Sequence, residues 1–110
     1  MMERKNGRIV GGSFDELVAM LSSSNHFDRA EAARLLVNMR KEAIKALPAL
    51  LALHNDPCDL VRIQVPRAII HMEARPDEAA EVLRCLLNDK DKIVRLYAEE
   101  AQQVLTQRTS

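Results

Sequence analysis

The sequence predicts an all-α fold, an α-solenoid of three helical hairpins with six helices in total. Similar residues recur at a spacing of 33, and Arg29, Arg62 and Arg95 occupy one such column. A period of this length is typical of stacked repeats, in which no unit buries its apolar face alone. The composition agrees, because 47% hydrophobic but only 3% aromatic residues favour aliphatic cores between closely packed helices. Three Gly and four Pro are too few for an all-β fold with many tight turns.

The repeats also set the domain boundaries. Residues 1–12 are expected to form a flexible leader, since three glycines lie within it. Residues 13–110 form one repeat domain, as suits a chain of this length. The three repeats within it cover about 13–40, 41–74 and 75–107.

In the first repeat, Ser13 is the expected N-cap of a helix over 14–21, and Glu16 completes a capping box with it. The polar run at 22–25 ends that helix. The same run offers the N-cap of a second helix over 26–40.

In the second repeat, a helix over 41–54 contains Pro48, which removes a backbone donor and predicts a bend. Asp59 is the expected N-cap of the next helix, over 60–73. Pro66 lies inside that helix and is expected to kink it or to split off its first turn.

In the third repeat, Pro76 suits the first turn of a helix over 76–87, and a polar turn precedes the last helix, over 92–107. Offsets of three and four residues along the six helices define the predicted buried side chains. These are Phe14, Leu17, Val18, Leu21, Phe27, Ala32, Leu35, Leu36, Met39, Ile44, Leu47, Leu50, Leu51, Leu53, Val61, Val65, Ala68, Ile69, Met72, Val82, Leu83, Leu86, Leu87, Ile93, Val94, Ala98, Ala101 and Leu105.

The turns of the second and third repeats share a charge pattern, an aspartate followed six residues later by an arginine. The two pairs are Asp56/Arg62 and Asp89/Arg95. With the surrounding residues, this pattern resembles HEAT repeats of the short bacterial kind, also found in phycobilisome-lyase-like proteins. The resemblance covers about residues 14–107 and implies that these four residues form a structural ladder between adjacent repeats. The first repeat departs from the pattern, with Ser23 in place of the aspartate and Asp28 in place of a valine, and resembles a degenerate capping repeat.

The resemblance also implies that the second helices of the repeats line the concave surface. Residues outside the predicted core share one face of each of these helices, because they lie three, four or seven positions apart. They are Glu31, Arg34, Asn38, Gln64, Arg67, His71, Tyr97 and Glu100. We expect a protein or peptide partner to bind this strip, and an ordinary solvated face is the alternative. The expected contact residues are Arg34, Gln64, Arg67, His71, Tyr97 and Glu100.

The predicted function is therefore that of a non-catalytic binding module: an adaptor, a scaffold or a small inhibitor. One alternative is nucleic-acid binding, which requires the arginines to be free of carboxylates. Its candidate residues are Arg29, Arg34, Arg62, Arg67 and Arg95. Sixteen basic and sixteen acidic residues give a net charge of zero, which counts against it. The other alternative is an accessory subunit that resembles the phycobilin lyases. The sequence leaves self-association open.

No catalytic, cofactor or metal site is predicted, since no nucleophile–base pair, phosphate-binding loop or metal-ligand spacing stands out. The histidines His26, His54 and His71 have no spacing that suggests a metal site, and no cysteine or carboxylate completes a ligand set. Cys58 and Cys85 fit free thiols in a reducing compartment. No segment is apolar enough to span a membrane and no secretory signal is found, so a cytoplasmic location is expected.

Overall fold

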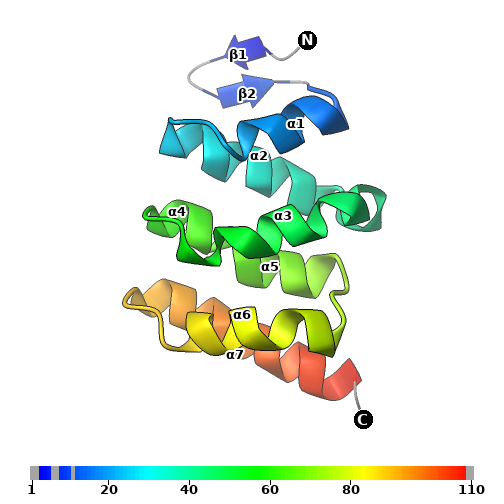
Figure 1. Ribbon diagram of the computed structural model, residues 1–110, viewed down its shortest axis with the longest axis vertical. Helices are drawn as coiled ribbons and strands as arrows, with labels where there is room; N and C mark the ends of the chain where they lie inside the picture. Colours follow the sequence, from blue (N-terminus) through cyan, green and yellow to red (C-terminus); the bar gives the residue numbers. More distant parts are fainter. Residues whose placement is uncertain (1–2, 6–7, 11, 109–110) are drawn as a thin grey trace.

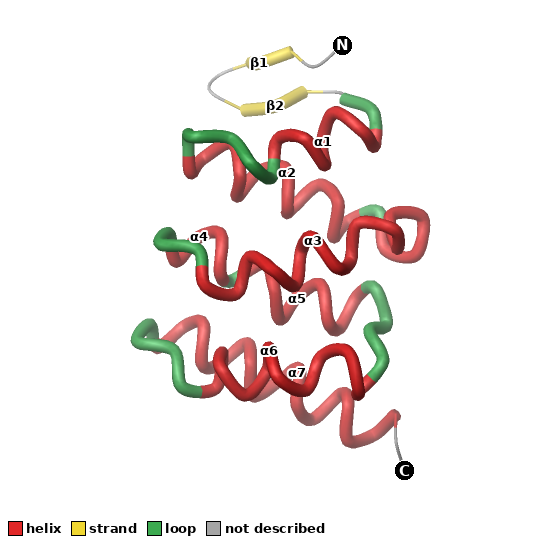
Figure 2. The backbone as a smooth tube through the Cα atoms, viewed as in Figure 1, coloured by secondary structure: helices red, strands yellow, loops and turns green. Residues whose placement is uncertain are grey.

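Three helical hairpins stack one on the next in the computed structural model, which describes residues 3–5, 8–10 and 12–108 (Figure 1). The first helices form one layer: α1 (Phe14–Met20), α3 (Leu47–Leu51) and α6 (Pro76–Leu87). The second helices form the other: α2 (His26–Asn38), α5 (Gln64–His71) and α7 (Lys92–Arg108). The turns within hairpins lie along one edge of the stack, and those between hairpins along the opposite edge (Figure 2). The predicted α-solenoid is confirmed.

The first hairpin begins with the predicted capping box. The Ser13 amide donates to Oε1 of Glu16 at 3.1 Å, and the Glu16 amide donates to Oγ of Ser13 at 3.3 Å. At the start of α2, Oδ1 of Asn25 accepts the amide of Phe27 at 2.8 Å. These bonds satisfy amides that a helix leaves unpaired in its first turn.

The first helix of the second hairpin is not the continuous helix predicted over 41–54. A 3₁₀ helix, η1 (Arg40–Ala46), comes first, and within it Ala43 departs from helical geometry, with φ −107° and ψ 23°. Then come α3 and a second 3₁₀ segment, η2 (Ala52–Asn55). Pro48 lies in the first turn of α3, where its missing N–H removes no intrahelical hydrogen bond. The predicted bend at Pro48 is therefore wrong, because the irregular backbone precedes the proline.

Pro66 has the predicted effect on the second helix of this hairpin. The helix divides at Ile63 into a single turn, α4 (Asp59–Arg62), and the longer α5. Pro66 is buried in the first turn of α5, where helix amides have no intrahelical acceptor.

The N-cap predicted for α4 is wrong by one position. Asp59 is the first residue of α4, and the N-cap is Cys58, which makes no side-chain capping bond. Cys58 shares its column with two residues that do cap, Asn25 and Asp91. Oδ1 of Asp91 accepts the amide of Ile93 at 2.8 Å at the start of α7. The second repeat has thus lost a cap that both of its neighbours keep.

The described part of the expected flexible leader contains two short strands, β1 (Glu3–Lys5) and β2 (Arg8–Val10). They pair in antiparallel fashion, with Glu3 opposite Val10. β2 contacts α2, so the hairpin lies against the first repeat (Figure 1). Strands of three residues are too short to show an alternating pattern, so the sequence does not indicate them.

The core is aliphatic, as the composition predicts, but three predicted core residues are exposed. Phe27 is 60% exposed, Ile93 49% and Ile44 43%. Phe27 and Ile93 each occupy the second position of their helix. The inward-facing column is the next one, in which Val61 and Val94 are fully buried.

Candidate functional site

Paired arginine and aspartate side chains connect successive repeats near the turns within the hairpins. Arg29 donates from Nε to Oδ2 of Asp56 at 2.8 Å and from Nη2 to Oδ1 at 3.0 Å. Arg62 repeats this arrangement with Asp89, at 2.9 and 3.1 Å. All four side chains are largely buried, at 7–14% exposure. Bidentate, charge-assisted hydrogen bonds of this kind fix the orientation of the two side chains as well as the distance between them.

The arginine of each repeat also holds the turn that precedes it. In all three repeats Nη1 donates to the carbonyl oxygen six residues earlier. The distances are 2.8 Å from Arg29 to Ser23, 3.0 Å from Arg62 to Asp56, and 2.6 Å from Arg95 to Asp89. The spacing of six residues is thus met by a backbone carbonyl. The carboxylate that the arginine binds belongs to the following repeat, 27 residues later.

The aspartates of the ladder shape their turns as well. Oδ1 of Asp56 and Oδ1 of Asp89 each accept the amide two residues later, both at 2.9 Å. Oγ of Ser23 does the same at 3.1 Å, so the first repeat keeps the turn although it has no carboxylate in that column. Asp28 is buried and accepts a hydrogen bond from Oγ of Ser23 at 3.2 Å.

The pKa values of Arg62 and Asp56 favour their charged forms. The hydrogen bond to Asp89 raises the pKa of Arg62 by more than burial lowers it. Burial by itself raises the pKa of Asp56. The hydrogen bonds from Arg29 and the Cys58 amide, with the charges of Arg29 and Arg62, outweigh burial and hold that pKa below its ordinary value. Asp56 is therefore ionised at neutral pH.

The predicted binding strip lies on the second helices and is cross-linked by hydrogen bonds. On α2, Nε of Arg34 donates to Oε1 of Glu31 at 2.6 Å. On α5, Nη1 of Arg67 donates to Oε1 of Gln64 at 2.6 Å, and Nη2 reaches Oδ1 of Asn38 on α2 at 3.4 Å. Gln64 is itself buried, whereas Arg34 and Arg67 are partly exposed and Asn38 is exposed.

His71, Glu100 and Tyr97 complete the strip on α5 and α7. Burial, together with the charges of Arg40 and Arg67, lowers the pKa of His71, while the charge of Glu100 opposes this shift. His71 is therefore neutral at pH 7. α5 and α7 are in contact, so His71 and Glu100 lie on neighbouring helices. Tyr97 is 37% exposed.

A row of exposed apolar side chains beside the strip is the feature that sequence reasoning missed. Phe27, Leu60 and Ile93 come one from each repeat, 33 residues apart, and Leu96 and Tyr97 extend the row on α7. We call these five residues the apolar row. Six large hydrophobic side chains are exposed within the described residues, and five of them belong to this row. The signal was present in the sequence, because this column is apolar in every repeat although it lies one position before the core column.

The apolar row and the strip meet in a groove of about 300 Å³ between α2 and the α4–α5 segment. Its lining residues are Phe27, Ala30, Glu31, Arg34, Leu60, Ile63 and Gln64. Apolar walls with a few well-held polar groups are the usual make-up of a protein recognition surface.

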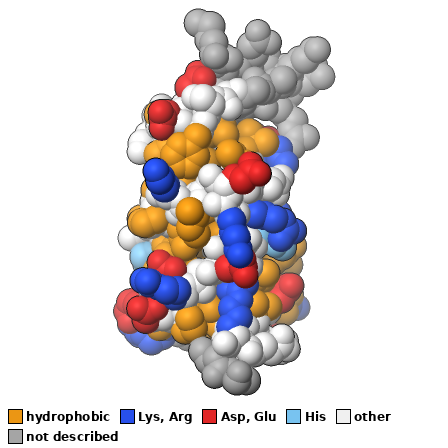
Figure 3. All heavy atoms as spheres, turned by 90° about the vertical axis from the view of Figure 1, so that its right-hand side faces the viewer, with side chains coloured by type: hydrophobic (Ala, Val, Ile, Leu, Met, Phe, Trp, Pro, Cys, Tyr) orange, Lys and Arg blue, Asp and Glu red, His pale blue; other side chains and the backbone are white. Residues whose placement is uncertain are grey.

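Four of the five arginines in the nucleic-acid hypothesis are already engaged. Arg29 and Arg62 bind aspartates, Arg34 binds Glu31, and Arg67 is hydrogen-bonded to two amide side chains. Acidic and basic side chains are intermixed with hydrophobic ones on the face shown in Figure 3, and neither sign predominates there. These contacts weigh against a phosphate-binding surface.

The histidines and cysteines do not gather into a site. Nδ1 of His54 lies 3.0 Å from the carbonyl oxygen of Leu51, and the thiols of Cys58 and Cys85 are free. Within the described ranges, no three histidine, cysteine or acidic residues are grouped to hold a metal ion. None of the helices in the part of the chain that the structure describes has the length and apolar character needed to cross a membrane.

The fold and the ladder together define a class of protein, the α-solenoids built from two-helix repeats. The model of the family described as HEAT repeats matches residues 14–103 of the chain. The chain therefore belongs to the HEAT-repeat family, whose members commonly mediate protein–protein interaction. No curated protein and no solved structure matches it.

Proposed function

We propose that the chain is a non-catalytic HEAT-repeat module that binds a protein or peptide partner on its second helices, as an adaptor, scaffold or small inhibitor in the cytoplasm. The apolar row is the observation that carries this proposal. Exposed apolar side chains recur in register across three repeats, and Phe27 and Leu60 line one groove. Exposed apolar surface of this kind marks interaction sites. The exposure of these side chains is costly to the free protein and is offset when a partner covers them.

The strip supplies the polar part of the same surface. Arg34 and Arg67 are held by hydrogen bonds to neighbouring side chains before any partner arrives. Fewer rotamers are therefore lost on binding, which lowers the entropic cost of association. Tyr97 belongs to both the strip and the row, and arginine and tyrosine are the residue types that dominate binding hot spots.

The test combines Arg67→Glu with Tyr97→Ala. Both side chains are at least partly exposed, so we expect the thermal melt of the double variant to match that of the parent protein. Partner capture from the native host, identified by mass spectrometry and repeated with the purified partner, is expected to be abolished. Undiminished binding by the folded double variant would refute this placement of the site.

A matched control changes the other layer of the solenoid. Ile44→Ala combined with Lys45→Glu removes an exposed apolar side chain and reverses one charge on η1. The change in size and charge resembles that of the test variant, but its location does not. We expect this control to keep full partner binding.

A further inference from the structure

The last arginine of the ladder, Arg95, has no carboxylate partner among the described residues. Nη1 of Arg95 donates to the carbonyl oxygen of Asp89, the same contact that holds Arg29 and Arg62 against their turns. In those two arginines, Nε and Nη2 then hold the carboxylate of the following repeat. No carboxylate of a described residue pairs with Arg95. Arg95 is thus anchored in the same way as the two arginines that hold a carboxylate.

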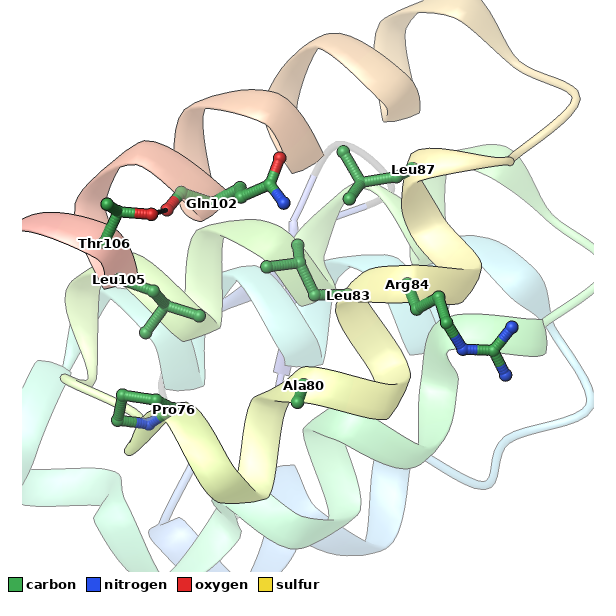
Figure 4. A pocket seen from close by; sticks show the side chains of 8 residues that line it. All are labelled: Pro76, Ala80, Leu83, Arg84, Leu87, Gln102, Leu105 and Thr106. Carbon is green, nitrogen blue, oxygen red and sulfur yellow. Dashed lines mark hydrogen bonds between the residues drawn. The ribbon is translucent and has the colours of Figure 1, made fainter. Parts of the chain in front are cut away.

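The same end of the solenoid carries an apolar groove of about 330 Å³ between α6 and α7 (Figure 4). Leu83 and Leu87 from α6 and Leu105 from α7 point into it, while the guanidinium of Arg84 points away. Gln102 on α7 adds a polar group at its border.

The repeat register shows what a surface of this kind accommodates. Pro76 and Ala80 line the groove and are exposed, whereas their counterparts 33 residues earlier, Ala43 and Leu47, are 0% and 2% exposed. In the second repeat the following hairpin packs on this side, because α6 contacts η2 and α7 contacts α5. In the second repeat, the element that covers Arg62 and the neighbouring apolar surface is therefore a helical hairpin with an aspartate in its turn.

We infer that the guanidinium of Arg95 and the α6–α7 groove form a second binding site. This site binds a helical hairpin of another protein that presents an aspartate in its turn. The carboxylate of that aspartate accepts hydrogen bonds from Arg95 as Asp56 does from Arg29 and Asp89 does from Arg62. Helix side chains of the partner fill the apolar groove. This site goes beyond the proposed function, because it consists of Arg95 and the α6–α7 groove, which belong to neither the strip nor the apolar row.

A second copy of this chain is a poor occupant of the site. The first repeat, which would stack on the open end, has Ser23 where the other repeats have aspartate. Its α2 is already contacted by β2 (Figure 1). Head-to-tail stacking would therefore leave Arg95 without a carboxylate, and the observations favour a partner of different sequence.

The first test uses a labelled synthetic peptide of residues 74–108, the hairpin that covers the second repeat in the structure. We expect it to bind the full chain in fluorescence anisotropy. Asp89→Asn in the peptide and Arg95→Gln in the chain should each weaken binding about tenfold or more, as for a charge-assisted hydrogen bond. The two changes together should cost little more than either alone, since they remove the same bond. Arg75→Gln in the chain, an exposed control, should leave binding unchanged.

The second test follows the Nε–H signals of the arginines by NMR in the unmodified chain, so it does not depend on a variant that folds. Sodium acetate is expected to shift the Arg95 signal saturably, whereas sodium chloride at equal ionic strength does not. The signals of Arg29 and Arg62 should stay in place, because their Nε atoms already hold carboxylates. Arg67→Glu with Tyr97→Ala should bind the peptide normally, which separates this site from the proposed function.

Three results would overturn the inference. The first is a peptide that binds the Arg95→Gln chain as well as it binds the parent chain. The second is an Arg95 signal that responds to acetate no more than that of Arg75. The third is a chain that dimerises by itself in sedimentation and loses the dimer on Arg95→Gln, which would make a second copy the occupant.

Discussion

Arg62 and Asp89 form a bidentate ion pair whose partners lie 27 residues apart and belong to different hairpins. The same guanidinium holds the carbonyl oxygens of Asp56 and Pro57 in its own turn. One side chain therefore orders the turn of the second repeat and fixes the third repeat against it. In a repeat protein, contacts between neighbours supply the stability that a single unit lacks.

Asp89→Ala is expected to lower the free energy of unfolding by about 3–5 kcal/mol, because it leaves the Arg62 guanidinium buried without a counter-charge. This is a large share of the stability of a small domain, which is typically about 5–15 kcal/mol. Urea unfolding followed by circular dichroism gives the midpoint and slope that measure the loss.

The control for this experiment is an exposed pair. Glu81→Ala breaks the Arg84–Glu81 contact, in which both side chains lie mostly in solvent, and the urea midpoint should not move. If Asp89→Ala proved as harmless as Glu81→Ala, the ladder would not be what joins the repeats.

Cys58→Asn is expected to stabilise the protein by roughly 0.5–2 kcal/mol, the usual contribution of an N-cap side chain. Cys58 makes no capping bond, whereas Asn25 in the same column accepts the amide of Phe27. Asparagine is preferred to aspartate here because Asp56 and Asp59 already place negative charge nearby. Thermal unfolding of Cys58→Asn and Cys58→Ser should rank asparagine first. A melt unchanged in both variants would show that the amides of α4 do not need a cap.

Glu73→Gly is expected to raise the melting temperature, with a gain of up to about 1 kcal/mol. Glu73 follows the end of α5 with φ of 52°, a left-handed conformation in which a β-carbon is unfavourable and glycine is preferred. The amide of Ala74 donates to the carbonyl of Ile69 at 3.2 Å across this turn, and glycine retains that bond. The substitution also removes the exposed ion pair with Lys41, a small loss.

Glu73→Ala is the matched control, because alanine loses the same ion pair but keeps the β-carbon. It should show none of the gain, and an equal rise in both variants would rule out backbone strain as the cause.

The features that could be predicted from the sequence depend on local chemistry or on the repeat. Ser13 and Glu16 lie three residues apart, so their reciprocal capping follows from helix geometry alone. Pro66 splits its helix because a proline ring excludes a backbone donor wherever the fold places it. The hairpin stack itself follows from a period of 33 residues, which is typical of stacked repeats.

The features that could not be predicted depend on distant parts of the chain. Periodicity assigned Phe27 and Ile93 to the core because both are apolar, but the core is complete without them and they face solvent. The aspartate partner of Arg29 lies in the next repeat, and a spacing of six residues within one repeat does not reveal it. Pro48 lies in the first turn of α3 because the chain first forms a 3₁₀ helix, which apolar spacing does not distinguish from an α-helix.

The ladder also predicts how stability depends on acid. The pKa of Asp56 is lower in the folded chain than in the unfolded chain, so the unfolded state binds the proton more readily. The stability that this carboxylate contributes is complete above its ordinary pKa of about 4 and is lost as the pH falls through the lower, folded value. The free energy of unfolding, measured by urea titration from pH 7 to pH 3, should therefore decline steeply below about pH 4.

Asp56→Asn should be less stable at pH 7 and lose part of this decline, because asparagine has no proton to bind. His71 affects stability in a different pH range. Its pKa is lower in the folded chain, so stability is lost as the pH falls below about 6.5. This loss should persist in Asp56→Asn. An acid decline as steep in Asp56→Asn as in the parent chain would assign the effect to other carboxylates.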